Sequence, residues 1–194
     1  MEYTDFRNAL LEESTYPISQ HIFDYIIEKG KKIELKKNEI LIGYDETDGS
    51  IYFILDGIIR GTVINDNGTE RTVGFGLCGT MLYSAQCYTM GNPSIYQYQA
   101  CCDSTVLKIA KAEFDRHLAE DHEFCRWVLG SFSLALGYRE LRNEGLNGDA
   151  LFKYEWLKEK RPEIIEAVSD KIIASYLNIT EVHLSRIKAK LLRE

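Results

Sequence analysis

Residues 33–109 consist of short β-prone segments separated by turn residues, and this pattern constrains the fold more than any other feature of the chain. Asn67-Gly68 predicts a hairpin with a type I′ turn, because Asn-Gly accepts positive φ angles. Short strands at such close spacing are typical of a β-sandwich or barrel, such as a double-stranded β-helix (jelly roll). The segments lie at 33–35, 40–42, 51–55, 58–63, 70–75, 96–100 and 105–109.

Helical periodicity precedes and follows these strands, so the predicted class is α+β. Apolar residues recur at helix spacing in 5–29 and in 111–118. In residues 121–143 they alternate steps of three and four, the 3.5-residue period of a helix that pairs with a partner. The alternative is a helix that lies on its own sheet. Pairing with a second copy predicts a dimer seam of Phe124, Trp127, Leu134, Tyr138 and Leu141.

Residues 170–191 have the spacing of a helix-turn-helix, two helices that cross over a tight turn. Ala174 is small where the second helix must come close. Asn178 stands where the first helix must end, and Asn is the best non-glycine residue for a left-handed conformation. Thr180 is placed to cap the next helix. The alternative is a helical hairpin that packs for its own sake.

In a helix-turn-helix, the N-terminal part of the second helix enters the major groove of DNA. Arg186 can bind a guanine edge through two hydrogen bonds, and His183 can reach a base or a phosphate. Lys188, Lys190 and Arg193 suit phosphates, which position a protein without specifying sequence. The predicted DNA-binding residues are Thr180, Glu181, Val182, His183, Ser185, Arg186, Lys188 and Lys190.

Charge is distributed unevenly along the chain. The net charge of −7 by itself argues against a nucleic-acid partner. However, residues 1–149 carry 14 basic and 23 acidic side chains, whereas residues 150–194 carry 9 and 7. The basic charge is therefore concentrated where the helix-turn-helix is expected.

The length of 194 residues fits one medium domain and one small domain. We expect a barrel domain with flanking helices at 1–120, a dimerisation helix at 121–146 and a DNA-binding domain at 147–194. No apolar run reaches the ~18 residues that span a bilayer, and the acidic N-terminal segment is unlike a signal peptide. These features predict a cytoplasmic protein without a membrane partner.

Two motifs, in this order along the chain, resemble those of Crp/Fnr-type transcription regulators. Residues 51–61, with Gly43 before them, are similar to the entry of that family's cyclic-nucleotide-type β-barrel. Residues 173–180 and 184–187 are similar to its helix-turn-helix, and 153–157 to the preceding segment in a bacterial branch. The resemblance implies a homodimer that binds DNA and senses a small effector in the barrel.

Nucleotide-binding members of that family hold the cyclic phosphate with a Gly-Glu pair and an Arg-Ser/Thr-Ala run. The matching stretches here are Gly79-Thr80 and 94–96, and residues 72–112 contain neither Arg nor Glu. A buried phosphate needs a charge-assisted partner, so we expect cyclic AMP to bind weakly or not at all. The expected effector pocket comprises Gly79, Thr80, Met81, Ser94, Ile95 and Tyr96.

Tyr, Met and Cys are frequent in residues 81–102. These side chains either contact an uncharged or aromatic effector or fill the barrel. The first of the five cysteines is Cys78, so the family's N-terminal iron–sulfur cluster is absent, and we expect structural thiols rather than a redox switch. A jelly-roll metal enzyme would need His ligands on its strands, but residues 33–109 contain no His. Sequence motifs of nucleotide-binding proteins and hydrolases are also missing. We expect no metal, no cofactor and no enzymatic activity.

The predicted function is that of a homodimeric DNA-binding transcription regulator. Its helix at 180–191 would read a near-palindromic site, and it would respond to an unknown effector rather than to cyclic AMP. The alternative is a small-molecule-binding or protein-interaction module that has lost productive DNA binding. Three features motivate that alternative. The barrel is acidic, Val182 stands where many family members have a cytosine-reading Glu, and we expect no strands for a full wing after the second helix.

Overall fold

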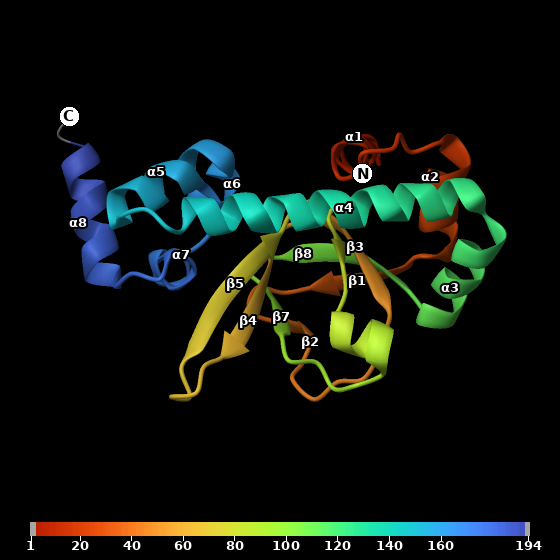
Figure 1. Ribbon diagram of the computed structural model, residues 1–194, viewed down its shortest axis with the longest axis horizontal. Helices are drawn as coiled ribbons and strands as arrows, with labels where there is room; N and C mark the ends of the chain where they lie inside the picture. The colour runs from red at the N-terminus through yellow and green to blue at the C-terminus, as the bar shows by residue number, and fades with distance from the viewer. Residues whose placement is uncertain (1–2, 193–194) are drawn as a thin grey trace.

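The computed structural model describes residues 3–192 and contains two four-stranded antiparallel sheets (Figure 1). The strand orders are β1-β8-β3-β6 and β2-β7-β4-β5. The predicted β-sandwich is confirmed, although the short β6 and a π-helical turn at Gln86–Met90 lie where the sequence reads as irregular. The strands are β1 (Lys31–Leu35), β2 (Ile40–Ile42), β3 (Ile51–Asp56), β4 (Ile59–Ile64), β5 (Glu70–Gly76), β6 (Met81–Leu82), β7 (Gln97–Ala100) and β8 (Ser104–Ile109).

The predicted hairpin joins β4 to β5, but the predicted turn type is wrong. Asn65 O accepts a hydrogen bond from Gly68 N at 2.8 Å, and Gly68 has a φ of +78°. Asn67 is not among the described residues with positive φ, which a type I′ turn requires at both central positions. The loop therefore has a negative-φ turn followed by a left-handed glycine, the arrangement typical of a three-residue hairpin loop.

The first core is built between the sheet that contains β3 and the helices beside it. These helices are α1 (Thr4–Glu12), α2 (Gln20–Lys29) and α3 (Lys111–Glu120), and they lie on the side of the molecule away from its C-terminus (Figure 1). Phe53 of β3 stacks on Trp127 with ring centroids 6.2 Å apart, and Phe124 lies edge-on to Phe114 at 5.2 Å. All four side chains are almost completely buried, so they form the centre of this core.

α4 (His122–Gly145) runs across the molecule from α3 to the C-terminal helices (Figure 1). It begins where the Asp121 carboxylate accepts a hydrogen bond from Phe124 N, an N-cap. Phe124 and Trp127 are 0% and 1% exposed in the chain's own core, so their prediction as dimer-seam residues is wrong. Their spacing reflects packing on the sandwich. The large apolar side chains that α4 leaves exposed are Leu129, Leu136, Tyr138 and Leu141, and Leu134 is half-buried.

The second core holds the C-terminal helices together and attaches them to the sandwich. It contains Leu157, Leu177 and Leu184, together with Ile58 and Leu77 from the sandwich. The helices are α5 (Ala150–Lys160), α6 (Pro162–Ala167), α7 (Asp170–Leu177) and α8 (Glu181–Leu191). No helix within residues 3–192 is long and apolar enough to cross a membrane.

Candidate functional site

The connection between α7 and α8 is a tight left-handed turn. Asn178 adopts φ 56° and ψ 49°, and Ile179 N donates to Ala174 O at 3.0 Å. Thr180 Oγ1 then caps α8 by accepting a hydrogen bond from His183 N at 3.2 Å. Ala174 is 1% exposed. The sequence-based roles of Ala174, Asn178 and Thr180 in this local geometry are therefore confirmed.

α8 buries one side and presents the other to solvent at the far end of the molecule (Figure 1). Leu184 and Ile187 face the core. Lys188 is half-buried and its ammonium is paired with the Asp170 carboxylate of α7, so part of its charge is already neutralised. Arg193 lies outside the described residues. The exposed predicted DNA-binding residues are Thr180, Glu181, Val182, His183, Ser185, Arg186 and Lys190.

α7 covers the edge of the second sheet. β5 is the last strand of that sheet, so its outer N–H groups lack a neighbouring strand. Ser175 Oγ accepts one of them, Thr72 N, at 2.9 Å. Beside it, the rings of Phe75 and Tyr176 have centroids 5.0 Å apart. The C-terminal helices therefore pack against β5, which also lines the pocket between the second sheet and α4.

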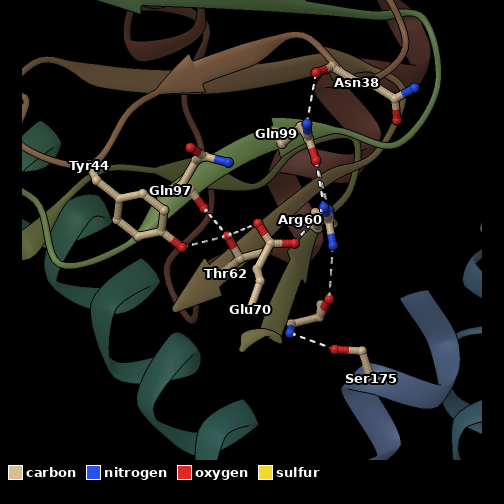
Figure 2. Close-up of polar contacts among 9 residues, drawn as sticks. Asn38, Tyr44, Arg60, Thr62, Glu70, Gln97, Gln99 and Ser175 are labelled. Carbon is tan, nitrogen blue, oxygen red and sulfur yellow. Dashed lines mark hydrogen bonds and ion pairs between the residues drawn. The ribbon is translucent and has the colours of Figure 1, made fainter. Parts of the chain in front are cut away.

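A polar network continues from this contact across the outer face of the sheet (Figure 2). The Arg60 guanidinium donates to Gln99 Oε1 at 2.6 Å and is 2.8 Å from the Glu70 carboxylate. It also donates to Thr72 Oγ1 at 3.3 Å. The network uses the charge of Arg60 fully within the sheet, so this arginine is not available to a ligand.

An open pocket of about 460 Å³ lies between the second sheet and α4. Of the predicted pocket residues, only Thr80, Met81 and Tyr96 line it. The other walls come from Gly61, Val73, Phe75, Tyr83, Tyr98 and Ala135, with Arg71, Arg139 and Arg142.

The remaining predicted pocket residues have other roles. Gly79 packs so tightly on α1 that an added Cβ would lie 2.7 Å from the Ala9 backbone. Ser94 is buried and donates to Tyr96 O, and Ile95 is exposed. The sequence reasoning missed Arg71 because the stretch that it searched begins at residue 72, and it missed Arg139 and Arg142 because α4 contributes them.

Burial keeps the Cys101 thiol protonated. Burial raises its pKa to about 11, since the thiolate loses solvation. At pH 8 this reduces the thiolate fraction about 100-fold relative to the ordinary pKa of 9.0. We expect Cys101 to resist iodoacetamide in the native protein and to react after unfolding in urea. Peptide mass spectrometry measures both, and rapid native alkylation would contradict this.

Residues 32–121 match the cyclic nucleotide-binding domain family, a segment that contains most of the two sheets and α3. The chain is also similar to FixK2 of Bradyrhizobium japonicum, with 18% identity, a TM-score of 0.70 and coverage of 84% of this chain and 85% of that one. It is similar to CLP of Xanthomonas campestris, a c-di-GMP responsive global regulator, with 12% identity, a TM-score of 0.71 and coverage of 90% and 92%.

A cyclic nucleotide-binding domain from Methylobacillus flagellatus is also similar, with 14% identity and a TM-score of 0.63 over 76% of this chain and 86% of that one. No curated protein sequence matches the chain. At these identities the similarity to FixK2 and CLP shows a shared fold over most of both chains.

Proposed function

We propose that the protein is a DNA-binding transcription regulator of Crp/Fnr type. The observation that carries the proposal is the pair α7 and α8, joined through Asn178 and capped by Thr180. Its second helix leaves Val182, His183 and Arg186 exposed, as a helix that enters a major groove requires. The similarity in fold to a global regulator over nine-tenths of the chain supports the proposal.

We further propose that two copies pair through α4. Leu129 and Leu136 lie two helical turns apart and are 58% and 60% exposed, although they are large and apolar. Tyr138 and Leu141 are also exposed, but they lie on another side of α4. Pairing would place two α8 helices about one DNA turn apart, so the expected site is near-palindromic.

The effector of the proposed regulator is a molecule other than cyclic AMP. Ser94 Oγ and Thr80 Oγ1 are engaged by the chain itself, with Tyr96 O and Leu77 N. Residues 72–112 contain neither Arg nor Glu, which supports an effector held by groups other than the family's phosphate cassette. We propose that the chain has three parts: the sandwich with its flanking helices, the dimerisation helix α4, and the DNA-binding helices from α5 onward.

The role of Arg186 provides the test. Replacement by alanine is expected to weaken specific DNA binding by about 1–3 kcal/mol, since a bidentate contact to a base edge is lost, and to relax the preference at one base pair. Binding of a randomised DNA library, measured with wild type and variant at one salt concentration, gives both quantities.

The matched control is Arg116→Ala, which removes an exposed arginine of α3 that pairs with Glu113 far from α8. Its DNA affinity should equal that of the wild type. Equal losses in the two variants would indicate a nonspecific charge effect and contradict the assigned role. The slope of log affinity against log salt concentration is a second criterion. Contacts to DNA phosphates make this slope steep, whereas binding by a protein-interaction module need not depend steeply on salt.

A further inference from the structure

Three of the four histidines of the chain, His21, His117 and His122, lie at the corner where α2, α3 and α4 meet (Figure 1). Two of them face the same carboxylate, that of Asp121. His21 Nε2 is hydrogen-bonded to Asp121 Oδ2 at 2.7 Å, and His117 Nε2 lies 3.5 Å from the same oxygen. The corner therefore places two titratable rings on one carboxylate.

Both oxygens of the Asp121 carboxylate are engaged without His117. Oδ1 accepts the hydrogen bond from Phe124 N that caps α4, and Oδ2 accepts from His21. A carboxylate only accepts, so His21 Nε2 carries a hydrogen, and the Ser19 hydroxyl, 3.0 Å away, donates to Nδ1 while the ring is neutral. His117 Nε2 is buried and has no hydrogen-bond partner within residues 3–192.

The His117 ring is packed as an apolar side chain would be. It stacks on the Tyr25 ring of α2 with centroids 3.6 Å apart, and its centroid lies 4.6 Å from that of the Phe124 ring of α4. Tyr25 and Phe124 are buried, and the side chain of His117 is only 20% exposed. One ring of α3 thus joins the packing of two other helices.

Burial disfavours a positive charge on His117. It lowers the pKa of this imidazole below the ordinary value of 6.5, and the attraction of the Asp121 carboxylate offsets only part of the effect. His21 adds to the effect, because a second imidazolium would repel the first. One carboxylate cannot neutralise two imidazolium groups, so a proton on each ring leaves a buried positive charge uncompensated.

The other ionisable groups around the corner do not supply the missing negative charge. Glu113 is paired with Arg116 through both carboxylate oxygens, at 2.7 and 2.6 Å. Glu120 and Glu123 are exposed, so water and salt screen their charges. Burial raises the pKa of Tyr25 to about 12, so its phenol stays neutral. The groups that face the two rings are, from α2, Tyr25; from α3, Glu113, Arg116 and Glu120; and from α4, Glu123.

We propose that this corner is an acid-sensitive switch. While its ring is neutral, His117 joins α2, α3 and the start of α4. Once the ring is charged, it leaves the site between Tyr25 and Phe124, and these three segments lose their contacts at the corner. The switch is independent of the proposed function, because it requires neither DNA nor an effector.

The direction of the pH dependence follows from linkage between proton binding and folding. The pKa of His117 is lowered in the folded chain, so the unfolded chain binds this proton more readily. The stability that the neutral ring provides is complete above the ordinary pKa of 6.5 and is lost as the pH falls through the lowered pKa. At pH 5 this titration can raise the unfolding equilibrium constant by at most about 30-fold.

Urea unfolding at pH 7 and pH 5 tests the contribution of His117. His117→Phe keeps an aromatic ring beside Tyr25 and Phe124 but removes the titration. Between pH 7 and pH 5 the unfolding constant of the wild type is expected to rise about tenfold more than that of His117→Phe. His122→Gln, which replaces an exposed histidine of the same corner, is the matched control and should behave as the wild type. Equal pH dependence in the wild type and His117→Phe would overturn the proposal.

A second measurement does not require that His117→Phe folds. NMR titration of the histidine ring protons gives the midpoint of His117 in the native protein, and Asp121→Asn removes the charge while keeping a residue that caps helices well. The midpoint is expected below 6.5 in the wild type and lower still in Asp121→Asn. A midpoint at or above 6.5 would show that the folded corner accommodates the imidazolium, for example by cation–π attraction to Tyr25, and would overturn the proposal.

Hydrogen exchange followed by mass spectrometry tests the opening itself. After correction for the intrinsic effect of pH on exchange, peptides from 20–29 and 111–124 are expected to exchange about tenfold faster at pH 5 than at pH 7. His117→Phe should not show this change, and β4 and β5 should stay protected at both pH values. Unchanged protection of the corner in the wild type would contradict the switch.

Discussion

Replacing Trp127 by alanine is expected to lower the free energy of unfolding by about 3–5 kcal/mol, because the change removes a large buried side chain and leaves a cavity. Trp127 is 1% exposed and packs on Phe53 and Phe124, with ring centroids 6.2 and 6.0 Å away. Urea unfolding followed by circular dichroism measures the loss.

Two further variants separate packing in the core from pairing on α4. Trp127→Phe keeps an aromatic ring and removes an indole N–H that has no acceptor among the described residues, so it should cost less than Trp127→Ala. Leu136→Ala changes a side chain that is 60% exposed and should leave the unfolding of a single chain almost unchanged while weakening the dimer. A larger loss of stability from Leu136→Ala than from Trp127→Ala would contradict the placement of these residues.

Replacing Gly57 by alanine is expected to lower the free energy of unfolding by about 2–5 kcal/mol. Gly57 follows β3 with a φ of +91°, and a left-handed conformation costs other residues about 1–2 kcal/mol. An added Cβ would also lie 2.8 Å from the Cα of Ser104, and relief of such an overlap costs about 1–3 kcal/mol more.

Gly68→Ala is the matched control for Gly57→Ala. Gly68 has a similar φ of +78°, but an added Cβ would meet no atom within 4 Å. Only the conformational cost of about 1–2 kcal/mol then applies. Equal losses in the two variants, measured by urea unfolding, would show that contact with Ser104 contributes nothing.

The sequence predicts those parts of the fold that depend on local chemistry. Short β-prone segments, the Asn178 turn and the Thr180 cap are each specified by neighbouring residues, and the structure contains all of them. The turn type at Asn67-Gly68 is wrong because Asn-Gly is compatible with two hairpin geometries, and strand register decides between them.

The parts that could not be predicted depend on which segments meet in space. A spacing of three and four residues cannot distinguish a dimer seam from packing on the chain's own sheet, and Trp127 belongs to the latter. The pocket charges come from residues 71, 139 and 142, which are distant in sequence and converge only because α4 crosses the second sheet. A search within residues 72–112 could not find them.

Selection of sheared genomic DNA by the purified full chain, followed by sequencing of the bound fragments, tests the central claim most directly. The account predicts enrichment of a two-fold symmetric motif whose half-sites are about one helical turn apart. Arg186→Ala should weaken that enrichment and relax the preference at one base pair, whereas Arg116→Ala should change neither. Absence of any enriched motif would contradict a DNA-binding function.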